Sequence, residues 1–452
     1  MAAFDKETLP AEIDALSRAL AEERYRHVAG LEPDPALQPI FAAHSRAAHR
    51  DTAAALRTEG EEGLASKVAA LRTERAQAED EESWRAAEAR ASVQGPDGAV
   101  PFALAQLAVG TERDRERRRA FGRGVAEASW LVAREAAMER RARARAEVGL
   151  LPDWERVVQA DALLGASDDA YRDVLAYTAR HEAELALPPR GDLERADLLH
   201  VLALHRWEGL FPRGMLAHTL EQTAAALRLD LGRIRIDEAS RPAQWPGAHA
   251  LGARVAFRRQ GGAADWLALF DAAGQAAANA AAPPHRRHDA APFTIGALLS
   301  GLLLDRGFLT ARLEVERKHA PDLVRALALR QLFRLRAAAA ALRVATEVER
   351  GTSGAAWHEA YREALSRAAC ASWPAGLAAR DGDGARAAAL LAGTARAERL
   401  RRSLVERHDE DWWKNPRSAA ELGSWLAAGG AWAEEEPPLG GGAEPLVKAM
   451  AS

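Results

Sequence analysis

Apolar residues recur at spacings of three and four along most of this chain, a pattern typical of amphipathic helices. The pattern covers residues 5–92, ends at the turn-forming segment Gln94–Gly98, and runs again from Trp266 to about Ala428. Ala, Leu, Arg and Glu, which are strong helix formers, fill most of these stretches. The sequence therefore predicts a mainly α-helical protein.

Two short stretches follow a different rule. Residues 233–237 (RIRID) and 253–259 (ARVAFRR) alternate apolar and polar side chains, and the segment SRPAQWPG between them is rich in turn formers. Alternation with a period of two on both sides of a turn predicts a small antiparallel β hairpin at about 233–259.

The hydrophobic pattern and composition of the chain indicate three regions. Residues 1–150 form an N-terminal helical region, and residues 151–430 form a second helical region that contains the hairpin. The segment EEEPPLGGGAEPL lies in residues 431–452 and has the low-complexity composition of a disordered tail.

Charge excludes one class of partner. The chain of 452 residues has 61 Lys and Arg against 65 Asp and Glu, a net charge of −4, so no overall positive field favours nucleic acid. The basic run Arg113–Arg119 contains Asp114 and Glu116, and we interpret it as a solvated helix face. We expect no nucleic-acid partner.

The cysteine content and the hydropathy of the chain bear on its location in the cell. Cys370 is the single cysteine, which excludes an intramolecular disulfide, and it is most simply a small buried residue. The N-terminus lacks a basic segment followed by an apolar run, and no window is long and apolar enough to span a bilayer. We expect a cytoplasmic protein with no membrane association.

The segment GGAADWLALFDAAGQAAAN, residues 261–279, carries a family resemblance. It resembles the frame GG-x-x-D-[YW]-x-x-L-[FL] that precedes His-Glu-x-x-His in the thimet oligopeptidase and oligoendopeptidase F superfamily of helical zinc metallopeptidases. The matching residues are Gly261, Gly262, Asp265, Trp266, Leu269 and Phe270. Weaker similarities in the same order extend the resemblance over roughly residues 110–425.

The resemblance implies a large helical, zincin-type body with a central cleft, in which an edge strand pairs with the backbone of a bound peptide. The residues it places at the cleft are Val255, Phe257, Gly261, Gly262, Asp265 and Phe270.

The same resemblance implies that the metal chemistry is missing. Zinc in this class needs two imidazoles one helical turn apart, a glutamate base beside the first, and a carboxylate from the next helix. The corresponding zinc-motif positions are Asp271, Ala272 and Gln275, and no Glu occurs between Glu238 and Glu314. Ala337 and Ala338 stand where relatives have a tyrosine pair. We therefore expect vestigial motif positions, no catalytic residue, no bound metal and no cofactor.

Other histidines leave one alternative open. His285 and His288 lie in the loop PPHRRHD, and together with Asp271 they could rebuild a metal site, although a surface-loop pair is the simpler interpretation. His200 and His205 are five residues apart, and we interpret both as core or boundary residues.

Three functional hypotheses follow. The favoured one is a catalytically inactive metallopeptidase-like protein that acts by binding a peptide or a protein partner, for instance an active paralogue. The alternatives are an active metallopeptidase with a non-standard metal site, and a purely structural helical protein whose cleft is filled by its own side chains.

Overall fold

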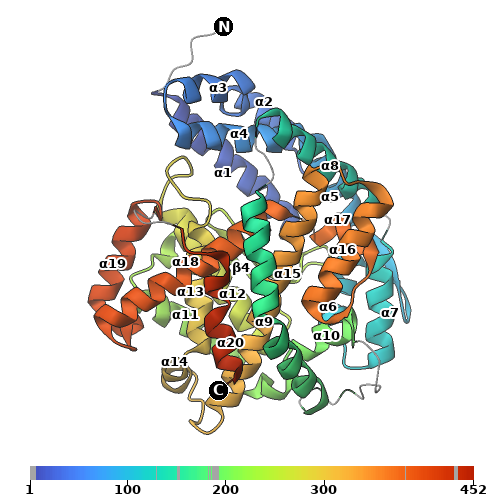
Figure 1. The fold of residues 1–452 in the computed structure, drawn as a ribbon, viewed down its shortest axis with the longest axis vertical. Helices are drawn as coiled ribbons and strands as arrows, with labels where there is room; N and C mark the ends of the chain where they lie inside the picture. Colours follow the sequence, from blue (N-terminus) through green and yellow to red (C-terminus); the bar gives the residue numbers. More distant parts are fainter. Residues whose placement is uncertain are drawn as a thin grey trace.

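The computed structural model describes residues 7–128, 130–149, 153–181, 183, 185, 193–381, 383–431 and 436–451. Helices dominate it, which confirms the predicted fold class (Figure 1). The N-terminal helices form one end of the molecule, coloured blue in Figure 1, around a hydrophobic core of their own that includes Leu16, Phe41 and Val68. Their bounds are α1 Leu9–Val28, α2 Leu37–Ala43, η1 Ser45–Ala48, α3 Arg50–Thr58, α4 Glu62–Ala76 and α5 Ala78–Arg90.

A second core joins segments that are far apart in the chain. Trp84, Tyr171, Leu332 and Trp357 are among its buried side chains. Its elements before the centre of the chain are β1 Ser92–Gly95, β2 Gly98–Pro101, α6 Phe102–Thr111, α7 Arg115–Ala126, α8 Leu131–Glu147, α9 Trp154–His181, β3 Leu193–Glu194 and α10 Arg195–Val201. Those after it are α15 Ala320–Glu349, α16 Gly354–Ala369, β7 Ala371–Ser372, η5 Ala375–Leu377 and α17 Ala378–Asp381.

A third core surrounds the helix that carries the family-like frame. Trp266, Phe270, Phe308 and Trp413 pack within it. Its elements are η2 His205–Leu210, α11 Arg213–Ala226, η3 Leu231–Arg233, β4 Arg235–Asp237, β5 Gly247–Leu251, β6 Arg254–Arg258, α12 Gly262–Ala281, α13 Ala291–Gly301, η4 Leu302–Leu304, α14 Arg306–Arg312, α18 Gly384–His408, η6 Trp412–Lys414 and α19 Pro416–Ala427. Because α15 and α18 each contribute to both the second and the third core, these two helices join them.

These cores do not follow the predicted boundary at residue 150. The second core contains Trp84 and Phe102 from the N-terminal side together with Leu342 and Leu391 from the other side. The hydrophobic pattern of the sequence indicates where helices begin and end, but it cannot show which distant helices share a core.

The predicted hairpin exists in a different form. The stretches at 233–237 and 253–259 do contain β4 and β6, but these two strands run parallel to each other. The antiparallel partner of β6 is β5, with Leu251 opposite Arg254. The order in the sheet is β4-β6-β5, so β4 and β5 are its edges. The segment 247–251, GAHAL, has weak alternation, which is why its strand escaped prediction.

Two further features differ from expectation. The turn at Gln94–Gly98 is itself a hairpin, in which Gly95 pairs with Gly98 between β1 and β2. The tail is ordered over residues 436–451, where η7 (Leu439–Gly442) and α20 (Glu444–Ala451) bury Leu439 and Met450 against the second core. Its few apolar side chains are enough to dock it, although Gly, Pro and Glu dominate its composition.

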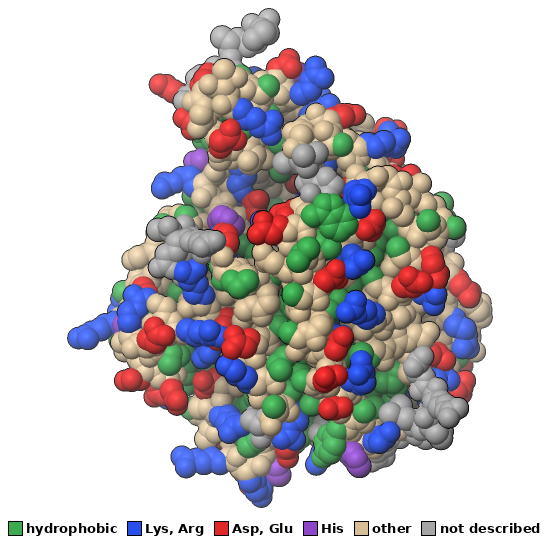
Figure 2. All heavy atoms as spheres, in the orientation of Figure 1, with side chains coloured by type: hydrophobic (Ala, Val, Ile, Leu, Met, Phe, Trp, Pro, Cys, Tyr) green, Lys and Arg blue, Asp and Glu red, His purple; other side chains and the backbone are tan. Residues whose placement is uncertain are grey.

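The basic run Arg113–Arg119 is only partly solvated. Arg115, Arg118 and Arg119 converge on the fully buried carboxylate of Asp197, at 2.9, 3.2 and 2.9 Å. A buried carboxylate requires such compensation. The sequence alone does not show that Asp197 packs against this run of arginines. On the face shown in Figure 2, acidic and basic side chains are interspersed.

Within the described residues, no single helix has both the length and the apolar composition of a membrane span. One pair of helices, Ala291–Leu304 and Arg306–Arg312, meets those two criteria only when counted together, and it bends by 74°.

Candidate functional site

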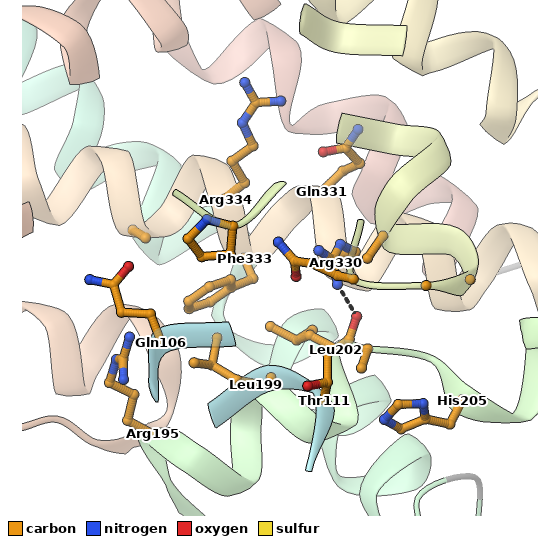
Figure 3. Close-up of a pocket in the computed structure, with 18 of the residues that line it drawn as sticks. Gln106, Thr111, Arg195, Leu199, Leu202, His205, Arg330, Gln331, Phe333 and Arg334 are labelled. Carbon is orange, nitrogen blue, oxygen red and sulfur yellow. Dashed lines mark hydrogen bonds between the residues drawn. The ribbon is translucent and has the colours of Figure 1, made fainter. Parts of the chain in front are cut away.

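A cavity of about 430 Å³ opens between α6, α10, the start of α12 and the middle of α15. It lies at the end of the small sheet where β5 begins and β6 ends, because Pro246 and Gln260 contribute to its wall. Figure 3 shows Arg330, Gln331, Phe333 and Arg334 on one side, with residues of α6 and α10 on the other. This volume falls within the usual range for ligand-binding pockets.

The glycines of the family-like frame form the turn from β6 into α12. Gly261 and Gly262 have φ angles of +105° and +54°, which disfavour any residue with a Cβ atom. Asp265 holds this turn, since its Oδ1 accepts a hydrogen bond from the backbone N–H of Gln260 at 2.6 Å. Burial raises the pKa of the Asp265 carboxyl.

Of the six predicted cleft residues, two line the cavity. Gly261 and Gly262 form part of its wall. Val255, Phe257 and Phe270 are fully buried in the third core, and Asp265 is 2% exposed. The frame residues that are apolar therefore serve packing, and only its backbone turn reaches the cavity.

The three zinc-motif positions lie on α12 and are buried. Asp271 Oδ2 accepts one hydrogen bond from Gln275 Nε2 at 2.8 Å and another from the Arg334 guanidinium at 2.8 Å. Ala272 packs in the third core. Arg334 also lines the cavity, so its side chain connects the cavity to the motif positions.

The neighbouring helix α13 approaches α12 too closely to supply another ligand at this point. A Cβ atom on Gly296 would stand 2.6 Å from Asp271 Oδ1 and 2.7 Å from the Asp271 backbone oxygen. A Cβ atom on Gly274 would stand 2.6 Å from the Ile295 backbone oxygen. Each helix therefore places a glycine against the backbone of the other, and no side chain fits between them.

These residues do not fit a zinc ion. The donor set is one carboxylate, already paired with a guanidinium, and one amide, whereas zinc sites use imidazole, thiolate and carboxylate ligands. In the described ranges, no three His, Cys, Asp or Glu side chains group together in a way that could hold a metal ion.

His285 and His288 have partners other than Asp271. His285 Nδ1 contacts Asp14 Oδ2 at 2.9 Å and so connects the 283–290 loop to α1. His288 lies beside the Arg396 guanidinium, and burial together with that charge lowers the pKa of His288 to about 4. The alternative of a rebuilt metal site finds no common geometry for these groups.

The other single-residue interpretations gave mixed results. His200 and His205 do lie together, with ring centroids 5.0 Å apart, and His205 reaches the cavity. Burial, followed by the charge of Arg118, lowers the pKa of His200 to about 4. Cys370 is half-buried at the end of α16, and burial raises the pKa of its thiol.

Sequence reasoning missed the arginines of the cavity. Arg330 and Arg334 belong to the α15 segment RQLFRLR, and their i, i+4 spacing places them on one helix face. That spacing was a signal, although in an arginine-rich chain it does not distinguish a cavity from solvent. Ala337, one of the two alanines singled out above, lies on the cavity wall, while Ala338 is buried.

Comparison with known proteins supports the fold. No protein-family model and no curated protein sequence matches the chain. Among solved structures, a putative oligoendopeptidase F from Bacillus anthracis str. Ames superposes with a TM-score of 0.51 at 11% identity, over 100% of this chain and 86% of the other. PZ peptidase A with inhibitor 2 superposes with a TM-score of 0.50 at 11% identity, over 96% and 82%. The predicted resemblance is thus confirmed at the level of the fold.

Proposed function

We propose that this chain is a noncatalytic protein built on the metallopeptidase fold, and that it binds a peptide segment in the cavity between α10, α12 and α15. The observation that carries the proposal is the bonding of Asp271. Its carboxylate is held by Gln275 and Arg334, at the positions where the family resemblance implies a metal-binding helix.

The electrostatics of that contact oppose a metal ion. The Arg334 guanidinium already supplies the positive charge that compensates Asp271, and a divalent cation at the same carboxylate would be repelled by it. Ala272 has no group that could activate water, so general-base catalysis has no candidate at the motif.

The cavity itself separates a binding function from a structural one. A cleft filled by its own side chains would leave little space, whereas about 430 Å³ remains beside Arg330, Phe333 and Gly261. The edge strand β5 begins next to this space, and among the described residues its outer edge pairs with no other strand. An extended peptide could therefore add to that edge and enter the cavity.

The test combines metal analysis with peptide binding. We expect purified protein to hold no stoichiometric zinc, to show no chelator-sensitive peptide hydrolysis, and to bind unfolded peptides saturably. Zinc near one ion per chain, removed by a chelator together with activity, would overturn the proposal in favour of a non-standard metallopeptidase. A complete absence of saturable peptide binding would overturn it in favour of a structural protein.

A cavity-filling variant locates the binding site. Ala337→Trp places an indole on the cavity wall and is expected to abolish peptide binding. Ala54→Trp, on the exposed surface of α3, is the matched control and should bind as the parent chain does. Equal binding by both variants would contradict the assignment to this cavity.

A further inference from the structure

The charged side chains around the cavity are strongly unbalanced. Among the described residues that line it are four arginines and one carboxylate, Glu208. Glu208 is itself close to Arg113, at 3.5 Å. The arginines are Arg195, Arg330, Arg334 and Arg380. The cavity therefore has a positive potential, although the chain as a whole is negatively charged at −4.

Arg330 has little direct compensation from the protein. Its guanidinium donates one hydrogen bond to the backbone oxygen of Leu202, drawn as a dashed line in Figure 3. Within the part of the chain that the structure describes, no carboxylate forms an ion pair with it. Burial lowers the pKa of Arg330 to about 10, and the nearby charge of Arg334 adds to this effect, whereas the carboxylate of Asp265 acts in the opposite direction.

Arg330 is partly buried, and to that extent the arrangement is unfavourable in the ligand-free protein. A charged group removed from water is normally paired, because a backbone oxygen offers a dipole and not a compensating charge. Arg334 differs, since one edge of its guanidinium is bound to Asp271 and its side chain is 32% exposed. Arg334 is thus paired directly with a protein carboxylate, whereas Arg330 has only the more distant charge of Asp265.

The rest of the wall can support a peptide. Gln106, Gln260 and Gln331 provide amide donors and acceptors, and Leu199 and Phe333 provide apolar surface. In Figure 3, Phe333 lies between Arg334 and Leu199, and Arg330 lies beside Leu202. Polar and apolar groups alternate around the arginines, as in pockets that orient a ligand by a few charged contacts.

We propose that this cavity recognises a carboxylate of the bound ligand, with Arg330 as its principal partner and Arg334 beside it. A guanidinium presents two parallel N–H donors that match the two oxygens of a carboxylate. That the ligand is a peptide rests on the proposed function; that it carries a carboxylate rests on the arginines alone. The carboxylate comes from an acidic side chain or from a peptide C-terminus.

Labelled short peptides distinguish the two sources by fluorescence anisotropy. The first carries Glu residues and has both ends blocked, the second replaces each Glu with Gln, and the third is the Gln peptide with a free C-terminal carboxylate. We expect at least one carboxylate-bearing peptide to bind about tenfold more tightly than the blocked Gln peptide. The Glu peptide binding tightly indicates a side-chain carboxylate, and the third peptide binding tightly indicates a terminal one.

Variants connect this preference to Arg330. Arg330→Gln removes the charge and keeps a hydrogen-bonding side chain, so the preference for carboxylate should disappear. Arg343→Gln on the same helix removes an arginine that pairs with Asp161 at the surface, and it should leave binding unchanged. Circular dichroism and thermal unfolding are used to check that both variants are folded.

The outcomes separate this inference from the proposed function. If all peptides bind equally and Arg330→Gln has no effect, the carboxylate inference is overturned while peptide binding stands. If free glutarate binds in an Arg330-dependent way and no peptide does, the carboxylate site stands and peptide binding fails. Tighter competition by inorganic phosphate than by glutarate would overturn the carboxylate assignment, and binding by none of these probes overturns both.

Discussion

Two arginines of α15 show opposite ways of burying a guanidinium. Arg336 is fully buried and donates to the backbone oxygens of Ala368 and Leu164, at 2.7 and 3.0 Å, and to Asp168 Oδ1 at 2.6 Å. Arg330, six residues earlier, faces the cavity and has one backbone acceptor. At 100° per residue the two side chains point about 120° apart around the helix.

The comparison separates structural from functional use of the same residue type. Around Arg336 the protein supplies the carboxylate, the carbonyls and a tyrosine ring, with Tyr171 at 4.7 Å, so three helices are joined through one side chain. Around Arg330 the protein supplies one backbone acceptor and the more distant charge of Asp265, so much of the compensation is left to a ligand. Changes to the two sites should therefore differ in sign as well as in size.

The largest effect is expected at Arg336. Arg336→Met removes the fully buried partner of an ion pair with the partly exposed Asp168 and takes a donor from several buried carbonyls, which we expect to cost about 3 kcal/mol. Urea unfolding followed by circular dichroism measures the loss. Arg343→Met, which disrupts a partly exposed pair on the same helix, is the control and should cost about 0.5 kcal/mol. Similar losses in both variants would remove the distinction between the buried and surface sites.

The next effect concerns the contact between α12 and the cavity wall. Asp271→Asn weakens a charge-assisted hydrogen bond and should lower the free energy of unfolding by about 1–3 kcal/mol. A double-mutant cycle with Arg334→Gln isolates the pair, and we expect a coupling energy of about 1 kcal/mol. A coupling near zero would show that Arg334 does not hold Asp271, and it would weaken the case for a noncatalytic site.

Low pH should reduce stability through the histidines beside the cavity. The pKa of His200 is lowered to about 4 by burial and by Arg118, and burial with Arg113 also lowers that of His205. In the unfolded chain the same two histidines have a pKa of about 6.5, so below that pH the unfolded chain binds more protons than the folded chain. Stability is therefore full above about pH 6.5 and is lost as pH falls towards 4.

Urea midpoints across that pH range measure the effect, and His200→Gln should reduce the slope without removing it, because the pKa values of His249 and His288 are also lowered to about 4. The environment of Arg336 serves as a reference, because none of its hydrogen-bond partners is a histidine. An unchanged slope in His200→Gln would mean that other groups carry the acid sensitivity.

The smallest expected effect has the opposite sign. Arg330→Met replaces a poorly compensated charge with an apolar side chain of similar length, and it should stabilise the ligand-free protein by about 0.5–1 kcal/mol. Thermal unfolding of the variant beside Arg330→Gln provides the measurement. A loss above about 1 kcal/mol would mean that Arg330 is structural, like Arg336.

Much of the architecture was predictable because its signals are local. Helical periodicity located the helices, and the frame Gly261–Phe270 indicated both the turn into α12 and the family-like fold. The strands β4 and β6 were found, but their parallel pairing was not, because β5 enters between them in the chain and takes the antiparallel edge. Strand order depends on packing between distant segments, which a single sequence does not encode visibly.

The site was predictable only in part. The identities of Asp271, Ala272 and Gln275 raise the question of a missing metal, and the sequence alone contains them. That Arg334 binds Asp271 across 63 positions of chain, and that Gly296 closes the space opposite, required the structure. Arg330, Arg334 and Arg336 occur within one arginine-rich segment, and nothing in their spacing tells which face meets a cavity.

The sequence by itself determined that this protein is helical, which residue types occupy the motif helix, and that they are poor zinc ligands. The tertiary structure decided where each charge finds its partner and where it does not. The physical reason is that helix propensity and periodicity act between neighbours in the chain, whereas compensation of a buried charge acts between neighbours in space. Arg330 and Arg336 are alike in the first respect and opposite in the second.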